Sequence, residues 1–311
     1  MRITVSFILL ASAFASAATT TQSVEQPLKP SLKWTTVEAY QTEITEPALL
    51  LKSDHVWLFA PKRKSKEADI IFKKLVAAYD QLYAIVGMQT KYKIVVLHLP
   101  NGFGGTSECV IEYNYDNLDF TKSEEWTKYK VPHVSGYIEE MAHNFVGTGR
   151  VQFGWEMVGW CLGVKVTQKV APNQLFANSI AATRKEQAAT FGRYKAANYT
   201  FPADLAPNLC DRIHAHLLYQ AEQRYGPNFY RDFFTEIRKE QQALADTSKI
   251  DEGGDDARRN ARYRIAVDCF DRLPRLGFKK TLEQNHISTT VDVKSLHPTD
   301  AGWNRRFEPS P

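Results

Sequence analysis

The strongest constraint on the fold is a change in hydrophobic pattern near residue 131 of this 311-residue chain. Before it, apolar runs of strand length at 55–60, 93–99 and 108–113 accompany one stripe of helical period at 67–86. After it, helical patterns occupy 155–170, 174–187, 209–224, 229–242 and 259–273. The order strand, helix, strand, strand predicts a small mixed sheet with a helix packed on one face. We therefore expect an α+β fold in which a mostly helical lobe follows the sheet, with a cleft between them.

Glycine, proline and serine residues mark where several of these elements begin and end. The stripe at 67–86 stops at Gly87, which is typical of a helix C-terminus. Pro61 and Pro100 close two of the strands, and Ser135 is expected to cap the helix that follows it. These residues set the expected boundaries of the sheet and of the first helix of the lobe.

The first 17 residues have the composition of a secretory signal peptide. Arg2 precedes an apolar run from Ile3 to Ala17, and the residues at 15–17 (Ala-Ser-Ala) fit a small-residue cleavage site. The run is shorter than the ~20 residues that a membrane span needs, so an uncleaved anchor is the less favoured alternative. We expect cleavage after Ala17, a secreted, periplasmic or extracellular location, and no stable membrane span in the mature chain.

The remaining chain divides by composition into four segments. Residues 18–50 are rich in Thr, Pro, Glu and Gln without a sustained period, which predicts an extended lead-in. The mixed-sheet subdomain is expected at 51–130 and the helical subdomain at 131–285. A tail at 286–311 completes the chain.

The charge distribution bears on the class of partner. The formal net charge is +4, and Lys/Arg clusters such as those at 62–64 and 258–259 are scattered among acidic residues. A nucleic-acid-binding protein instead gathers its basic residues on one face. We therefore expect no nucleic-acid partner.

Four cysteines, Cys109, Cys161, Cys210 and Cys269, would enter an oxidising compartment with the secreted chain. An even number allows three disulfide pairings, and the sequence does not choose between them. Cys210 and Cys269 both lie in the helical part, so their pairing is favoured here, with buried free thiols as the alternative. C-x-x-C spacing is absent from the sequence, which argues against a cysteine metal site.

The segment at 136–145 carries the main functional signal. Its run E-E-M-A-H at 139–143 differs by one residue from the zinc-binding pattern H-E-x-x-H. In that pattern two histidines at i and i+4 share one face of a helix, and the glutamate after the first polarises the metal-bound water. Glu139 occupies the position of the first histidine. Glu156 follows at a spacing that leaves room for a helix end, a turn at 147–149 and a returning helix.

The chain resembles a secreted gluzincin metallopeptidase, nearest to the enhancin-like and mucin-degrading branches, over roughly residues 55–280. The resemblance is carried by the segment 136–145, by Trp155-Glu156, by the Gly104-Gly105 entry before the motif helix and by the run at 225–234. It implies a zincin-like fold with the cleft between the sheet and the helical lobe. It also implies an extended peptide or glycoprotein as substrate or partner.

The resemblance assigns roles to individual positions. Glu140 would be the general base, and Glu139, His143 and Glu156 would hold Zn²⁺. The strand at 108–113 would be the edge strand that pairs with an extended peptide.

Other residues would act on the substrate from around this centre. Gly105, Thr106 and Glu108 would contact the substrate at the entry to the edge strand. His214, His216 and Tyr219, on a later helix, are candidates for stabilising the oxyanion. The alternative for these three is that they are satisfied interior or surface groups.

Glu139 makes the ligand set more negative than the usual one. Two neutral histidines and one glutamate carry −1, whereas one histidine and two glutamates carry −2. Oxygen-rich sets suit harder ions such as manganese, magnesium or calcium, so another divalent metal is an alternative to zinc. The added charge also weakens acidification of a bound water and predicts a poorer hydrolase. His133 could supply the missing nitrogen, with a loop histidine as the alternative reading.

Three functions follow from these patterns. The first is a secreted metallopeptidase-like protein that hydrolyses extended peptide or glycoprotein. The second is a catalytically inactive relative that binds peptide or glycan through the same cleft, and the third is a structural secreted domain. The joint presence of Glu140, His143 and Glu156 favours a site that is used. The sequence leaves the oligomeric state open.

Overall fold

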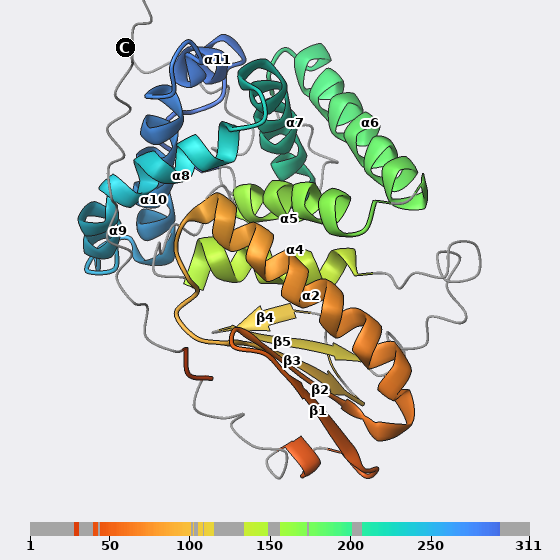
Figure 1. Cartoon of the computed structure of the whole chain (residues 1–311). Coiled ribbons are helices and arrows are strands. Elements are labelled where there is room, and N and C mark those ends of the chain that lie inside the picture. Colours follow the sequence, from red (N-terminus) through yellow and green to blue (C-terminus); the bar gives the residue numbers. More distant parts are fainter. Residues whose placement is uncertain are drawn as a thin grey trace, which may run out of the picture.

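A computed structural model describes residues 28–30, 40–42, 44–100, 102, 105–107, 109–114, 134–148, 156–172, 174–200 and 207–292. The expected α+β fold is confirmed, with a mixed sheet and a helical C-terminal part (Figure 1). The strands are β1 (Ala48–Lys52), β2 (Val56–Pro61), β3 (Ile94–Leu99), β4 (Gly105–Ser107) and β5 (Val110–Asn114). The helices of the sheet side and of the first helical layers are α2 (Ser65–Val86), α4 (Ser135–His143), α5 (Glu156–Val170), α6 (Gln174–Ala196) and α7 (Pro207–Tyr225). The remaining helices are α8 (Phe229–Lys239), α9 (Gln241–Thr247), α10 (Gly254–Asp271) and α11 (Phe278–Gln284).

The sheet has the order β1-β2-β3-β5-β4. Its central strands β2, β3 and β5 are parallel, and β1 and β4 run antiparallel at the two edges. Helix α2 supplies the crossover that the parallel pair β2 and β3 requires. The prediction that the strand at 108–113 forms the edge is therefore wrong, because β5 lies between β3 and β4.

The edge strand is one step earlier in the chain than expected. Ser107 pairs with Val110, so two residues connect β4 to β5 in a tight hairpin. Cys109, at the second of these positions, has a φ of 68°, the left-handed conformation that two-residue hairpin turns require. The short hairpin places Gly105 and Thr106 on the edge strand itself.

Both faces of the sheet are covered by apolar groups. Leu58 and Val96 point to the face that packs against α2 and α4. Phe59 and Val95, their neighbours in sequence, point to the opposite face and pack with Tyr40. This alternation follows from the two-residue period of a strand. Part of the expected lead-in at 18–50 therefore covers the second face, and its last residues begin β1, a strand that the sequence pattern did not predict.

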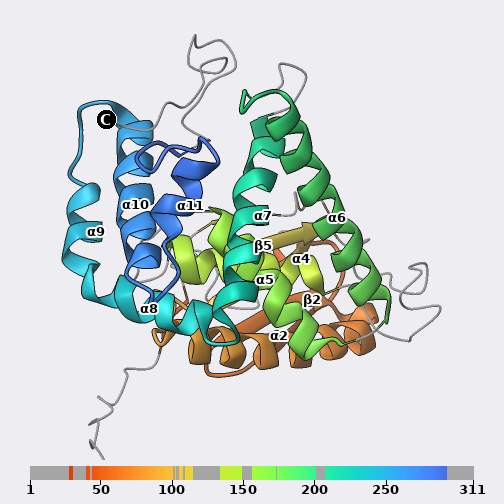
Figure 2. The same cartoon turned by 90° about the horizontal axis from the view of Figure 1, so that it is seen from above.

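The helices form layers above the sheet. In Figure 1, α4 lies above the sheet, α5 lies above α4, and α6 and α7 lie further away, with α8 to α11 to one side. Figure 2 shows the same arrangement from above, with α7 over α5 and the α8–α11 group beside it. One apolar core runs from the sheet through α2, α4 and α5 into α8 and α10. The mixed sheet and the helical part thus share their hydrophobic core.

The end signals in the sequence are only partly confirmed. Gly87 has a φ of 70° and donates its N–H to the carbonyl of Tyr83 at 2.7 Å, as expected for a helix C-terminus. Ser135 is instead the first residue of α4, and the N-cap is Val134, so the predicted serine cap is wrong. Among the described residues, no helix has the length and apolar character to cross a membrane. Residues 1–17 lie outside the described part of the chain.

The cysteines are buried thiols wherever the structure describes their side chains. Cys269 is a free thiol, so the favoured Cys210–Cys269 disulfide is wrong; the side chain of Cys210 lies outside the described part. Arg272 donates a hydrogen bond to Cys269 Sγ at 3.0 Å. Burial raises the pKa of the Cys269 thiol to about 11, which disfavours the thiolate that disulfide exchange needs.

Candidate functional site

Helix α4 carries Glu139 and His143 one turn apart on one face. The Oε1 atom of Glu139 and the Nε2 atom of His143 are 4.0 Å apart, and their side chains are 36% and 19% exposed. The opposite face of the helix, with Ile138 and Met141, is buried in the core. The amphipathic pattern of the helix thus leaves the two potential ligand side chains partly exposed.

Two glycines of α5 bring that helix close beneath the pair. A Cβ atom at Gly159 would lie 2.6 Å from Nδ1 of His143, and one at Gly163 would lie 2.8 Å from Cα of Glu139. The contacts run in opposite directions along the two helices, so α4 and α5 are antiparallel, as expected. We call Gly159 and Gly163 the glycine seat of α5, because the absence of side chains at these positions leaves room for the imidazole of His143 and the backbone of Glu139.

Asn144 ties the end of α4 to the hairpin at the sheet edge. Its Nδ2 atom donates a hydrogen bond to the carbonyl of Glu140 at 3.0 Å. Its Oδ1 atom accepts the backbone N–H of Cys109 at 2.9 Å. Asn144 is buried, so both hydrogen bonds are shielded from water. The motif helix therefore has a fixed position relative to the turn between β4 and β5.

Glu140 and Tyr113 complete the charged and polar groups beside the pair. Burial, followed by the nearby charge of Glu140, raises the pKa of Glu139 to about 7. Burial also raises the pKa of Glu140. The pKa of Tyr113 on β5 is raised by burial and then by both carboxylates, Glu140 first, so its phenol stays protonated. The site thus contains two carboxyl groups with raised pKa values, Glu139 and Glu140, and one hydroxyl donor, Tyr113.

A chain of rings and hydrogen bonds supports Tyr113. The Nε2 atom of His98 and the hydroxyl of Tyr137 are 2.8 Å apart, and the rings of Tyr137 and Tyr113 lie 4.1 Å apart. The Tyr113 hydroxyl lies over Gly136, where a Cβ atom would come within 2.6 Å of it. His98 is fully buried, and burial lowers its pKa to about 4, so the ring is neutral. The first turn of α4 therefore packs closely against the phenol of Tyr113, and a side chain at position 136 would clash with it.

The structure places other predicted residues to different degrees. Gly105 and Thr106 lie on the edge strand β4, and α4 contacts that strand. Glu156 is the first residue of α5, and its side chain lies outside the described part. Glu108 and His133 also lie outside the described residues.

The three candidates for oxyanion stabilisation, all on α7, have separate surroundings. His214 is buried, and its ring stacks on Tyr263 at 5.6 Å. His216 is 3.0 Å from Gln220 through their Nε2 atoms. Tyr219 lies 4.0 Å beneath the guanidinium of Arg184. Each side chain thus has a local role in packing or polar contact.

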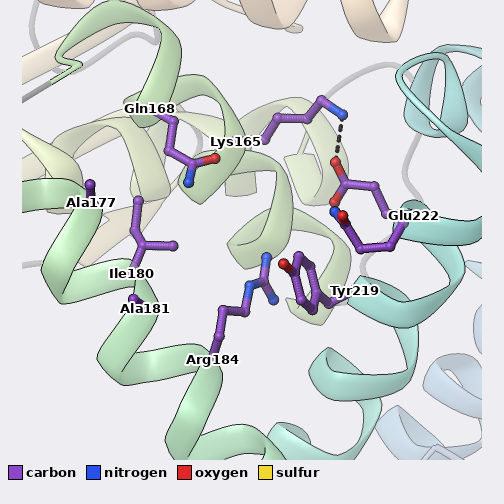
Figure 3. A pocket seen from close by; sticks show the side chains of 9 residues that line it. Lys165, Gln168, Ala177, Ile180, Ala181, Arg184, Tyr219 and Glu222 are labelled. Atoms are coloured by element: carbon purple, nitrogen blue, oxygen red, sulfur yellow. Dashed lines mark hydrogen bonds and ion pairs between the residues drawn. The ribbon is translucent and has the colours of Figure 1, made fainter.

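Tyr219 lines a pocket of about 410 Å³ between α5, α6 and α7 (Figure 3). Lys165 forms an ion pair with Glu222 across it at 2.6 Å. The guanidinium of Arg184 lies 4.0 Å from the ring centroid of Tyr219 and 5.7 Å from that of Trp160. The lining carries two basic side chains, Lys165 and Arg184, and one acidic side chain, Glu222.

A second group of potential metal ligands lies in the helical part. One ligand atom each from Asp211, His214 and Asp292 come within 4.8 Å of one another, and all three residues are buried. Burial, followed by the charge of Asp292, raises the pKa of Asp211 to about 8, although Arg259 opposes the rise. This Asp-His-Asp group could hold a metal ion.

Sequence reasoning missed this group and the role of Tyr113. Asp211 and His214 are three residues apart on one helix, a spacing that could have been noticed as a shared face. Asp292 lies far along the chain, and no local pattern links it to them. Tyr113 was assigned to a strand, but its approach to Glu139 depends on how α4 crosses the sheet.

Comparisons of the chain with protein-family models, with curated proteins and with solved structures found no match. The function of this chain is therefore inferred from the geometry and chemistry of the site itself.

Proposed function

We propose that this chain is a secreted, metal-dependent hydrolase of gluzincin type that acts on extended peptides or glycoproteins. Glu139, His143 and Glu156 would hold Zn²⁺, and Glu140 would serve as the general base. The observation that carries the proposal is the pair of ligand atoms on Glu139 and His143, 4.0 Å apart over the glycine seat of α5.

The described residues of this set fit a bound cation. Zinc binds carboxylate oxygen and imidazole nitrogen at about 2.0–2.2 Å, so two ligand atoms on one ion lie roughly 3.4 Å apart in tetrahedral geometry. The 4.0 Å between Glu139 and His143 closes to that value with a side-chain movement below about 1 Å. A cation between them would also offset the repulsion that helps raise the pKa of Glu139.

Glu156 enters the proposal through the register of α5. It lies three residues before Gly159, which faces His143, and residues three apart occupy one side of a helix. Gly163 lies against Glu139 and Gly159 lies against His143, so α5 runs toward the C-terminal end of α4 as its numbering decreases. Position 156 is therefore expected near the His143 end of α4. This register supports Glu156 as the third ligand.

Each neighbouring side chain then has a chemical task. A bound zinc ion would polarise the substrate carbonyl and lower the pKa of a water at the site. Glu140 would accept the proton from that water, because burial moves its pKa toward the working range of a general base. The protonated phenol of Tyr113 would donate a hydrogen bond to the negative charge that develops on the substrate oxygen.

The substrate class rests on the position of β4. This strand ends the sheet next to α4, and an extended peptide could add to it by backbone hydrogen bonds. The N-terminal sequence supports a secretory route, and the balanced charge supports a peptide or glycoprotein partner over a nucleic acid.

A catalytically inactive binding protein is the competing proposal. The second carboxylate in the ligand set favours it, because added negative charge weakens the acidification of water. The edge strand β4 and the exposed face of α4 would then bind peptide or glycan without cleavage. A structural secreted domain is the remaining alternative and requires no metal at α4.

Metal analysis combined with hydrolysis separates these alternatives. We would measure metal content and cleavage of casein or mucin for the wild type and for Glu140→Gln, with Glu112→Gln on β5 as a carboxylate control. We expect stoichiometric metal in all three proteins and a loss of cleavage of at least about 100-fold in Glu140→Gln alone. Metal at α4 without cleavage in the wild type would favour the binding protein. A wild type that takes up no metal at α4 would contradict the proposal.

A further inference from the structure

The Asp211, His214 and Asp292 group joins two parts of the helical lobe. Asp211 and His214 lie on α7, whereas Asp292 lies in the segment that follows α11. They are only 4%, 3% and 2% exposed. A buried charged group requires a partner of opposite charge or hydrogen bonds that replace water.

The positive charge of Arg259 acts on more than one carboxylate. Arg259 on α10 acts on Asp211, and it also forms an ion pair with Asp256 at 2.7 Å. One guanidinium therefore serves at least two carboxylates, while Asp292 adds a further buried acid to the same place. A divalent cation among the three side chains would offset the repulsion between the carboxylates of Asp211 and Asp292.

The surroundings hold the three side chains in place. The ring of Tyr263 stacks on His214, and the Tyr263 hydroxyl donates a hydrogen bond to the carbonyl of Ser288 at 2.8 Å. The backbone N–H of Asp292 donates to Oδ1 of Asn260 at 2.9 Å. Helix α10 therefore orients both the imidazole and the segment that carries Asp292, as preorganised ligand sets require.

We propose that Asp211, His214 and Asp292 bind a divalent transition-metal cation that fastens the segment after α11 to helix α7. Ligand atoms on one such ion lie at most about 4.2 Å apart, so atoms that already lie within 4.8 Å of one another need shifts of at most roughly 1 Å. One nitrogen and two carboxylate donors suit zinc or manganese better than calcium or magnesium, which prefer oxygen alone. Because the group is buried, the ion is structural and contacts no substrate.

The experiment must separate this site from the one proposed on α4. We would prepare Glu139→Gln/His143→Gln as a background that lacks the α4 ligands, remove metal with a chelator, and titrate zinc. The background should bind one zinc ion. Zinc at about 100 times its Kd should then raise the melting temperature by about 5 °C. X-ray absorption at the zinc edge should show nitrogen and oxygen neighbours with one imidazole.

Single carboxylate variants in that background test the assignment. Asp292→Asn keeps the shape of the side chain and should weaken zinc binding at least tenfold, whereas Asp251→Asn, an exposed residue before α10, should change nothing. If Asp292→Asn does not fold, the stoichiometry and the X-ray absorption of the background decide alone. Calcium should give no comparable rise in melting temperature.

Three results would overturn the proposal. A background that binds no zinc excludes the site, whatever the α4 ligands do in the wild type. A metal-free Asp292→Asn variant more stable than zinc-loaded background would identify a carboxyl pair that shares a proton. An equal response to calcium would contradict the transition-metal assignment. Failure of the α4 proposal would instead appear as equal zinc content in the wild type and the background.

Discussion

The two clusters of potential metal ligands differ in exposure and in origin. Glu139 and His143 belong to one helix and keep 36% and 19% of their side-chain surface exposed. Asp211, His214 and Asp292 come from two segments and are almost completely buried. A site on an accessible helix face can exchange its ion and admit a substrate. A buried site between distant segments can do so only when the fold opens locally.

The largest expected contrast is in the rate of metal loss. With both sites loaded with zinc, a chelator should empty the α4 site at least about 100-fold faster than the buried site, because local opening costs several kcal/mol. The release of zinc to a chromogenic chelator should show two phases. Glu139→Gln/His143→Gln should remove the fast phase and Asp292→Asn the slow one. A single phase that either variant abolishes would remove the distinction between the sites.

His98, which lies beside Tyr137 of α4, should make the folding stability depend on pH. Its pKa is about 4 in the folded protein and near 6.5 in an unfolded chain, so the unfolded state gains a proton first as the pH falls. The stabilisation is complete above pH 6.5, and about 3 kcal/mol is lost as the pH falls to 4. Urea unfolding at a series of pH values gives the slope of the unfolding free energy against pH. Between pH 4 and 6.5 this slope should correspond to one proton fewer in His98→Gln than in the wild type. Tyr137→Phe keeps the titrating ring and should retain the slope.

Replacing Glu139 by the usual histidine ligand should increase the zinc affinity of the α4 site. Glu139→His adds an imidazole one turn from His143 and removes one negative charge, so zinc affinity should rise about tenfold or more. Cleavage of casein should rise with it, and Glu139→His combined with Glu140→Gln should lose that gain. Zinc binding no tighter than in the wild type would mean that Glu139 does not face the ion.

The glycine seat of α5 gives the smallest expected effect. In Gly159→Ala the new methyl group would displace the imidazole of His143, and we expect about a tenfold loss of zinc affinity at α4. The helix propensity of alanine, about 1 kcal/mol above glycine, should limit the cost to folding. Gly192→Ala on α6, where a Cβ meets nothing within 4 Å, should leave zinc binding unchanged. Equal effects of both variants would indicate a general change in the helices.

Local patterns predicted much of the fold. The stripe ending at Gly87 and the apolar runs at 55–60 and 93–99 correspond to α2, β2 and β3, because periodicity and end residues are local properties. Strand β4 has three residues and begins with Gly105, too short a segment to show a period. The buried position of Tyr40 against the sheet depends on a distant partner, so a polar lead-in was the natural expectation.

The candidate site also has features that local sequence patterns predict and features that depend on distant contacts. The spacing of Glu139 and His143 fixes their common helix face, and the structure confirms that face. The contacts of Gly159 and Gly163 depend on the crossing of two helices, and the meeting of His214 with Asp292 depends on the path of the whole lobe. Neither can be read from residues that are adjacent in sequence.

Under the proposed function, the shortness of β4 would limit how much of a substrate the edge recognises. Three strand residues can form ladder hydrogen bonds with only about three residues of an added peptide, and successive side chains of that peptide point to opposite sides. Selectivity at this edge would therefore rest on one or two substrate positions, which suits digestion of varied sequences. The same shortness limits the pairing of this edge with other copies of the chain, since long exposed edges invite aggregation.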